Sequence, residues 1–306
     1  MSAVLLAVLT AGLHAQRVEW VSACACESPE AVHLEREGVE AHRVRRLEEA
    51  SAAYTRALKL APPRDPAPAE RELILRLAPR VFVQPRDPFP LRDAAAILHP
   101  SQPWIAYHFF WEDDIDFPDD NDPCDHELMW VRLDTKRENI AGYYTYFHGR
   151  ILRAPPGSVE EARRHGGRPA VVVQWGKHGT MPLGWETLSI IPDRGDVEAS
   201  RMTVDRQSTL EAYNRATWEK LSTAGREAQD SPLARGWPLK FPGSWADFTR
   251  FTRRVDLRPF LLERNYLKVS CLNNAVIDRY FLLYNFSAKT EWPAAMCEAG
   301  APVGVR

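Results

Sequence analysis

The hydrophobic pattern changes along the chain from a helical period to a strand period. Apolar positions recur every three or four residues over 31–62 and 69–78, which predicts two short amphipathic helices and then a third. Farther on, short runs of β-branched and aromatic residues predict strands separated by loops, at 104–111, 128–133, 143–147, 171–175, 266–271 and 279–286. This order favours a mainly β fold: a β-sandwich with a few peripheral helices, preceded by a small α-helical hairpin.

Two further helices are expected among these strands. Ser158 and Glu161 have the spacing of a capping box for a brief helix, and a longer amphipathic helix is expected over 206–222.

The N-terminal hairpin resembles one unit of a tetratricopeptide repeat. Small and large residues follow the spacing of that repeat at Leu34, Gly38, Ala41, Ala50, Tyr54, Ala57 and Pro62. A single repeat cannot bury its own apolar face, so residues 31–62 either dock on the main domain or present a surface to a protein partner. A plain helical hairpin used for packing is an equally good interpretation.

Three segments are expected along the chain. Residues 2–13 are apolar and end before Ala15, which predicts a secretory signal peptide over 1–15 and a secreted or periplasmic protein. A proline-rich linker at 61–68 then divides a hairpin segment, 16–66, from a sandwich domain, 67–306. A buried first helix is the alternative for the apolar stretch, and Val21-Ser22-Ala23-Cys24 weakly resembles a lipoprotein motif.

The net charge limits the kinds of binding partner, and the cysteine spacing limits the kinds of metal site and disulfide. With 39 basic and 41 acidic side chains among 306 residues, the formal charge is −2, and nothing indicates nucleic acid as a partner. The apolar N-terminal stretch is too short for a transmembrane span. The five cysteines fit no zinc spacing, and in an exported chain Cys271 and Cys297 form a plausible disulfide.

An acidic segment is the strongest chemical signal. Residues 112–127 contain nine carboxylates and no Lys or Arg. A solvated loop is the simplest interpretation, and an EF-hand does not fit because Pro118 occupies a ligand position. Asp125 and Glu127, however, lead into a strand and point to the same side as the apolar Met129. At the rim of a sandwich such a pair needs compensation, for which a divalent cation is suited.

Two histidines are expected at the same rim. His148 and His178 each end a predicted strand and precede a glycine, so their rings can converge there. Oxygen ligands favour Ca²⁺ or Mg²⁺. Coordination by His126, His148 and His178 together would favour Mn²⁺ or Zn²⁺.

Several of these motifs resemble the necrosis-inducing-like proteins. The aromatic run Trp104–Asp114 and then Asp125-His126-Glu127 are similar to the aromatic strand and the GHRHDWE motif of that family, and a related vacuolar-protein-sorting-sixty-two-like family has similar elements. The resemblance covers about residues 75–190. It implies a β-sandwich with a Mg²⁺ or Ca²⁺ site and binding to sphingolipid headgroup sugars. The implied metal ligands are Asp114, Asp125, Glu127, His148 and His178.

The chain departs from the family motif at its centre. His126 replaces the Trp of D-W-E, and Asp122-Pro123-Cys124 replace its glycine- and histidine-bearing half. These departures favour metal binding over toxin activity.

Three functions stay open at this point. The first is an exported, cation-binding module that recognises a sugar, a glycolipid headgroup or a membrane surface. The second is a metal-dependent hydrolase of phosphoesters or glycosides, with Glu127 or His178 as general base. The third is a structural or interaction protein that acts through the hairpin. Nucleophile-elbow, phosphate-loop and H-E-x-x-H motifs do not occur in the sequence.

Overall fold

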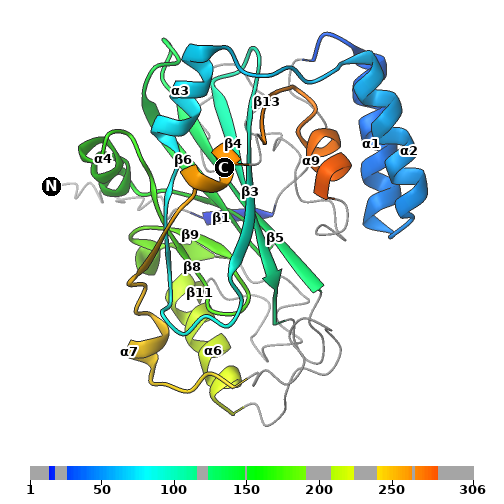
Figure 1. The fold of residues 1–306 in the computed structure, drawn as a ribbon. Coiled ribbons are helices and arrows are strands. Elements are labelled where there is room, and N and C mark those ends of the chain that lie inside the picture. The colour runs from blue at the N-terminus through cyan, green and yellow to red at the C-terminus, as the bar shows by residue number, and fades with distance from the viewer. Residues whose placement is uncertain are drawn as a thin grey trace, which may run out of the picture.

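The fold is a β-sandwich with a helical hairpin packed on one side (Figure 1). The computed structural model describes residues 14–17, 26–115, 123–148, 150–190, 208–223, 240–263 and 266–281. Its helices are α1 (Pro29–Arg43), α2 (Leu47–Leu60), α3 (Pro68–Leu77), α4 (Pro156–Arg164), the 3₁₀ turn η1 (Trp185–Thr187), α6 (Leu210–Thr223), α7 (Trp245–Phe248), α8 (Arg258–Glu263) and α9 (Asn273–Phe281).

The strands form two sheets. The larger has nine strands in the order β11-β10-β1-β7-β6-β5-β4-β3-β13, and the smaller has four in the order β12-β2-β8-β9. The strands of the larger sheet are β1 (His14–Arg17), β3 (Leu91–Leu98), β4 (Trp104–Asp113), β5 (Pro123–Leu133), β6 (Ile140–Phe147), β7 (Arg150–Arg153), β10 (Ser189–Ile190), β11 (Ser208–Thr209) and β13 (Leu267–Val269). Those of the smaller sheet are β2 (Arg80–Val83), β8 (Ala170–Val173), β9 (Thr180–Pro182) and β12 (Arg253–Asp256).

The main core lies between the two sheets. Alternate residues of β4, among them Tyr107 and Phe109, pack with Val81 of β2 and Val171 of β8 in one buried cluster. Because side chains alternate across a strand, the other residues of β4 point to the opposite face of the larger sheet. The predicted mainly β fold is therefore confirmed, including the aromatic strand that is covered on both faces.

A second core covers that opposite face. Phe110 and Trp130 of the larger sheet pack with Tyr54 of α2 and Val276 of α9. In Figure 1, α9 lies beside the hairpin formed by α1 and α2. The hairpin thus docks on the sandwich, which is one of the two roles open to a single helical pair.

Buried polar contacts fix this docking. Glu35 accepts a hydrogen bond from the backbone N–H of Ala275 at 2.9 Å, near the N-terminus of α9. His42 Nδ1 lies 3.1 Å from Asp278 Oδ2, and both side chains are fully buried. Tyr54 Oη accepts a hydrogen bond from the Asn274 side chain at 2.6 Å. These contacts orient α9 against both helices of the hairpin.

Three sequence predictions need correction. The strand expected at 279–286 is wrong as far as residue 281, because residues 273–281 form α9. Ser158 is not a helix cap: α4 begins at Pro156, and the Ser158 hydroxyl donates to the carbonyl of Leu183 at 2.5 Å. Cys271 forms its disulfide with Cys26 across 245 residues, and Cys297 lies outside the described residues. Residues 273–281 form a helix and not a strand because one face of α9 packs against the apolar surface of the hairpin.

One further predicted helix is found, and most of the predicted signal peptide lies outside the described residues. The helix expected over 206–222 is α6, preceded by the short β11. The first 13 residues of the predicted signal peptide lie outside the described residues, and its cleavage site after Ala15 falls within β1. Export remains a prediction. Among the described helices, none combines the length and apolarity needed to cross a membrane.

Candidate functional site

The ends of the acidic segment lie at one end of the sandwich, where β4 stops and β5 begins. Asp125 pairs with Trp111 across these two strands, and Glu127 pairs with Phe109. Both carboxylates are on the face of β5 that carries Met129 into the core between the sheets. Asp125 is 6% exposed and Glu127 is 2% exposed. The predicted inward orientation of the pair is therefore found.

His178 meets Asp125 and a third residue, Asp87. His178 Nδ1 lies 3.1 Å from Asp125 Oδ2, and His178 Nε2 lies 3.3 Å from Asp87 Oδ1. The imidazole also stacks on the Trp111 ring, with 4.3 Å between ring centroids and 8° between the planes. We call Asp87, Asp125 and His178 the rim triad. It joins the β2–β3 loop, the start of β5 and the β8–β9 turn.

Asp87 is the residue that sequence reasoning missed. Its carboxylate accepts backbone hydrogen bonds from Phe89 at 3.0 Å and Gly176 at 3.1 Å. It therefore fixes its own loop and ties that loop to the β8–β9 turn. Its surroundings, Pro85-Arg86-Asp87-Pro88, contain no strand pattern or binding motif that distinguishes it from an ordinary loop aspartate.

Both predicted histidines adopt a backbone conformation that is uncommon outside glycine. The φ angle is +52° at His178 and +45° at His148. Such left-handed residues cost about 1–3 kcal/mol and persist where the surroundings hold them, often at functional sites. At His178 the turn is closed by its N–H, which donates to the carbonyl of Gln174 at 3.0 Å. The strain aims the imidazole inward, between the two carboxylates.

The rim triad holds an imidazolium. Burial alone lowers the pKa of His178, but the charge of the Asp87 carboxylate and the hydrogen bond that His178 donates to Asp125 outweigh it and raise the pKa to about 10. At neutral pH both ring nitrogens therefore carry protons and donate to the carboxylates. The positive charge lies where the sequence prediction placed a divalent cation.

His148 lies in the neighbouring β6–β7 turn. A Cβ added at Gly179 would lie 3.1 Å from His148 Nε2, so the turn that carries His178 passes close by. His148 Nε2 donates to the side-chain carbonyl of Gln174 at 2.6 Å, and Gln174 donates in turn to Asn214 at 2.8 Å. The two predicted histidines thus come near each other through Gln174 and Gly179.

Asp114 lies at the end of β4, beside the same turn. Its backbone N–H donates to Asp113 Oδ1 at 2.9 Å. The next residue, Ile115, donates its N–H to the carbonyl of Gly176 at 2.5 Å and accepts from Lys177 Nζ at 2.9 Å. The end of β4 is therefore held against the turn that carries His178.

The donor set does not form a metal centre in the part of the chain that the structure describes. Within it, no group of three or more His, Cys, Asp or Glu side chains is arranged to hold a metal ion. A histidine ligand must direct a lone pair at the metal, whereas both nitrogens of His178 face carboxylates and His148 Nε2 faces an amide oxygen. We therefore derive no chemical step through a metal.

His126 points away from the rim triad. It alternates with Asp125 along β5, so its ring lies on the hairpin side of the larger sheet, where its Nε2 is 3.0 Å from His108 Nδ1. His108 Nε2 bonds the side chain of Asn273 in α9 at 3.1 Å. Burial lowers the pKa of His108 to about 3, and the Asn273 hydrogen bond opposes this only in part. Joint coordination by His126 and His178 is excluded because they lie on opposite faces.

Comparison with known proteins gives structural matches only. No protein-family model and no curated protein sequence matches the chain. A structure described as "Toxin fold for microbial attack and plant defense" is 15% identical, with a TM-score of 0.30 over 54% of this chain and 84% of its own. The structure of NLPPya in complex with glucosamine is 16% identical, with a TM-score of 0.31 over 55% of this chain and 86% of its own.

A third structure, of Necrosis and Ethylene inducing Protein 2 from the causal agent of cocoa's Witches Broom disease, is 13% identical. It has a TM-score of 0.28, with 53% of this chain and 82% of its own covered. These are proteins of the family that the sequence motifs resemble, although at such TM-scores they do not assign the chain to that family and carry no argument about its activity. The comparisons do not support the vacuolar-protein-sorting-like or tetratricopeptide-like parts of the resemblance.

Proposed function

We propose that this chain is an exported binding protein that recognises a sugar, a glycolipid headgroup or a membrane surface at the rim-triad end of its sandwich. The observation that carries the proposal is the rim triad itself. Three ionisable side chains from separate elements converge at one end of the sandwich, and one of these residues, His178, has a left-handed backbone conformation. Buried ionisable clusters with perturbed pKa values are found preferentially at functional sites.

The chemistry of this end suits a polar ligand. The carboxylates of Asp87 and Asp125 are held in fixed positions. The side chain of Asp87 is fully buried and that of Asp125 is 5% exposed, so Asp125 is the one that reaches the surface. Arg86, which is exposed, precedes Asp87, and Lys177, which is half-buried, precedes His178. A sugar hydroxyl can donate to a fixed carboxylate and accept from a neighbouring cation. The rigid cluster would orient such a ligand without reorganisation.

Binding of a divalent cation is a second part of the proposal. Asp125 and Glu127 share one face of β5, and their oxygens are ligands that Ca²⁺ and Mg²⁺ prefer. Mn²⁺ or Zn²⁺ would require a histidine nitrogen, and those of His178 are engaged with carboxylates. Ca²⁺ or Mg²⁺ therefore stays a proposal, and in the described arrangement it would have to displace His178 from Asp125.

Calorimetric titration of the full chain tests the proposal. The probes are a panel of neutral and amino monosaccharides and phosphatidylcholine vesicles with or without glycosphingolipid, each with Ca²⁺, Mg²⁺ or EDTA. Asp125→Asn keeps the side-chain shape and removes its charge, and Glu48→Gln on the exposed surface of α2 is the control. We expect at least one probe to bind and Asp125→Asn to weaken that binding roughly ten- to hundredfold, because a charged hydrogen bond contributes about 1.5–3 kcal/mol.

Two results would overturn the proposal. One is that no probe binds under any ionic condition. The other is that Asp125→Asn binds as well as the wild type and the Glu48→Gln control. If EDTA leaves both the affinity and the thermal unfolding temperature unchanged, the divalent cation is eliminated while the sugar-binding proposal stands.

A further inference from the structure

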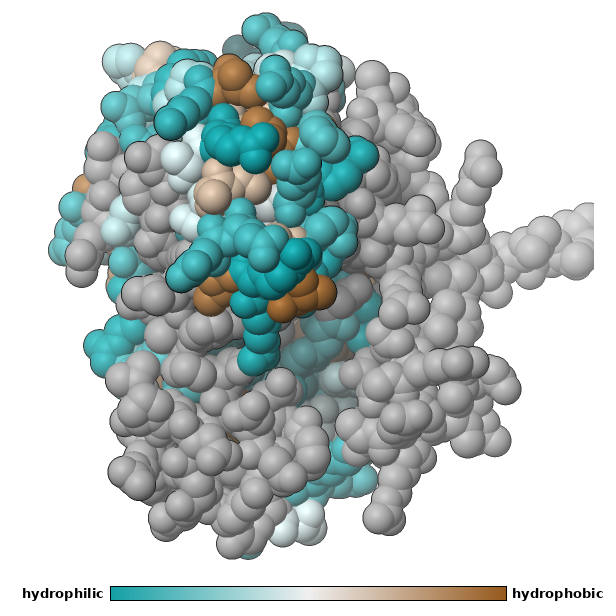
Figure 2. Space-filling model, turned by 90° about the vertical axis from the view of Figure 1, so that its right-hand side faces the viewer, coloured by the Kyte–Doolittle hydropathy of each residue, from teal (hydrophilic) through white to brown (hydrophobic). Residues whose placement is uncertain are grey.

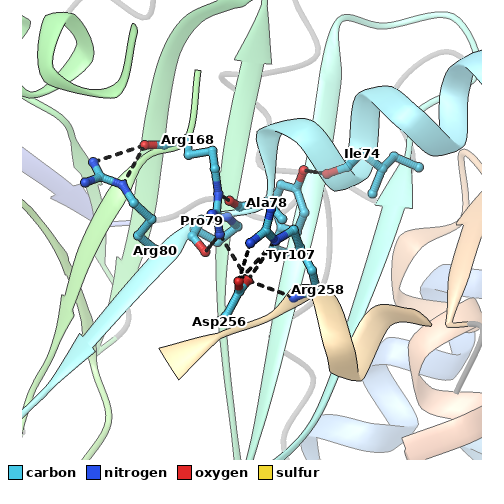
Figure 3. A network of polar contacts seen from close by, with 8 residues as sticks. All are labelled: Ile74, Ala78, Pro79, Arg80, Tyr107, Arg168, Asp256 and Arg258. Atoms are coloured by element: carbon cyan, nitrogen blue, oxygen red, sulfur yellow. Dashed lines mark hydrogen bonds and ion pairs between the residues drawn. The ribbon is translucent and has the colours of Figure 1, made fainter. Parts of the chain in front are cut away.

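A cluster of arginines surrounds one carboxylate at the edge of the smaller sheet (Figure 3). Asp256, the last residue of β12, accepts a hydrogen bond from Arg168 Nη2 at 3.1 Å. It also accepts from Arg258 Nε at 3.1 Å and from Arg258 Nη2 at 2.5 Å. Arg168 is fixed from its other side because its Nε donates to the carbonyl of Ala78 at 2.8 Å. Two guanidinium groups thus share a single carboxylate.

Two more arginines extend the cluster. Arg80 lies opposite Asp256 across β2 and β12, and its guanidinium is held by Glu161 at 2.5 Å. Arg254 precedes Asp256 by two residues in β12, so the two side chains project from the same face of the sheet. Arg254 is exposed, and Arg258 is 45% exposed. Together the four arginines and two carboxylates carry a formal charge of +2.

The positive charge of the cluster affects the pKa values of Arg168 and Asp256. Burial lowers the pKa of Arg168; Asp256 opposes that shift, and Arg258 and Arg254 lower it further. Burial would raise the pKa of Asp256, but hydrogen bonds from Arg258 and the charge of Arg168 hold it at about 2. Asp256 is therefore ionised at neutral pH, and its carboxylate already accepts hydrogen bonds from both Arg168 and Arg258. A second anion would relieve the mutual repulsion of the arginines.

We propose that Arg168, Arg254 and Arg258 form a binding site for a phosphate group. Guanidinium groups bind phosphate oxygens through paired, directional hydrogen bonds, and here one guanidinium is rigidly held while two reach the surface. The whole chain has a formal charge of −2, so attraction of an anion must come from this local surface and not from the net charge. The phosphate belongs either to a phospholipid headgroup or to a small soluble molecule. This site is separate from the rim triad.

The test uses the full chain with two probes. The first is inorganic phosphate, followed by calorimetry. The second is cosedimentation with phosphatidylcholine vesicles that contain or lack phosphatidic acid. Arg254→Gln removes an exposed cation of the site without changing Asp256, and Arg254→Lys keeps the charge but loses the paired geometry. Arg56→Gln, an equal charge change on the exposed surface of α2, is the control.

We expect the wild type and Arg56→Gln to bind at least one probe, Arg254→Gln to bind about tenfold more weakly, and Arg254→Lys to fall between them. The weakening corresponds to one charged hydrogen bond. Binding to phosphatidic acid vesicles but not to plain ones identifies a lipid phosphate, and binding to inorganic phosphate alone identifies a soluble one. The proposal is overturned if neither probe binds, or if Arg254→Gln and Arg56→Gln bind equally well.

Discussion

His178 has both ring nitrogens bonded to carboxylates, so its role differs from that of a metal-binding histidine. As an imidazolium it neutralises part of the charge of Asp87 and Asp125, and its ring covers Trp111. Removing one partner from a buried ion pair leaves an uncompensated charge, which is far costlier than the pair itself is stabilising. The stability of this end of the sandwich therefore depends on protonation of one side chain.

The stability of the chain should fall at alkaline pH because of His178. Its folded-state pKa is raised to about 10, above an unfolded-state value of about 6.5. The stabilisation is thus fully present below about pH 6.5 and is lost as the pH rises toward 10. His178→Gln should lower the free energy of unfolding by about 3–5 kcal/mol at pH 6, and the difference from the wild type should shrink by pH 10. Urea unfolding of both proteins at pH 6, 8 and 10 measures this.

His33→Gln is the control for that experiment, because His33 lies exposed on α1. It should unfold like the wild type throughout the pH range. A destabilisation by His178→Gln that is the same at every pH would show that the imidazole acts through packing and not through its charge.

At the scale of elements, the hairpin and α9 form one unit with the larger sheet. Gly38 allows the close crossing of α1 and α2, because a Cβ there would lie 2.5 Å from the Tyr54 ring. The disulfide between Cys26 and Cys271 joins the segment before α1 to the segment before α9. The covalent link and the buried contacts of Glu35 and His42 therefore hold the same two elements together.

Loss of the disulfide should loosen this unit. The double variant Cys26→Ser/Cys271→Ser should unfold with a free energy about 2–5 kcal/mol lower than that of the wild type, because the link restricts the unfolded chain. Dithiothreitol should lower the thermal unfolding temperature of the wild type and leave that of the variant unchanged. An equal effect of the reductant on both proteins would contradict the assignment of the pair.

At the scale of the whole molecule, the hairpin covers a face of the larger sheet that would otherwise be apolar. Phe110, Trp130 and Tyr144 lie beneath it and beneath α9. Figure 2, which views the molecule from the hairpin side, shows a coloured surface that is mostly hydrophilic with scattered hydrophobic spots. The hairpin therefore replaces an aromatic surface with a polar one. A protein partner for residues 31–62 stays a prediction.

Deleting residues 26–66 should destabilise the sandwich, because apolar area contributes about 25 cal/mol per Å² when buried. We expect the truncated chain to bind a hydrophobic dye and to unfold at a lower temperature or to aggregate. Coexpression of residues 26–66 as a separate chain should restore solubility. A truncated domain with unchanged thermal stability would instead assign the hairpin to partner binding alone.

The sequence by itself determined the elements whose signal is local. The continuous apolar run of β4 predicted the buried aromatic strand. Alternation along β5 predicted the inward side chains of Asp125 and Glu127, because a strand fixes which neighbours share a face. Helical spacing predicted the hairpin for the same reason. The glycines after His148 and His178 marked two turns that do lie close together, because a Cβ added at Gly179 would lie 3.1 Å from His148 Nε2.

Only the tertiary structure decided the contacts between distant segments. Asp87 joins His178 from 91 residues away, which no local pattern encodes. The same holds for the pairing of Cys26 with Cys271 and for the end of α9, where residues 279–281 were predicted to begin a strand. Local spacing fixes the direction in which a side chain points, whereas its partner depends on how the sheets and the hairpin pack together.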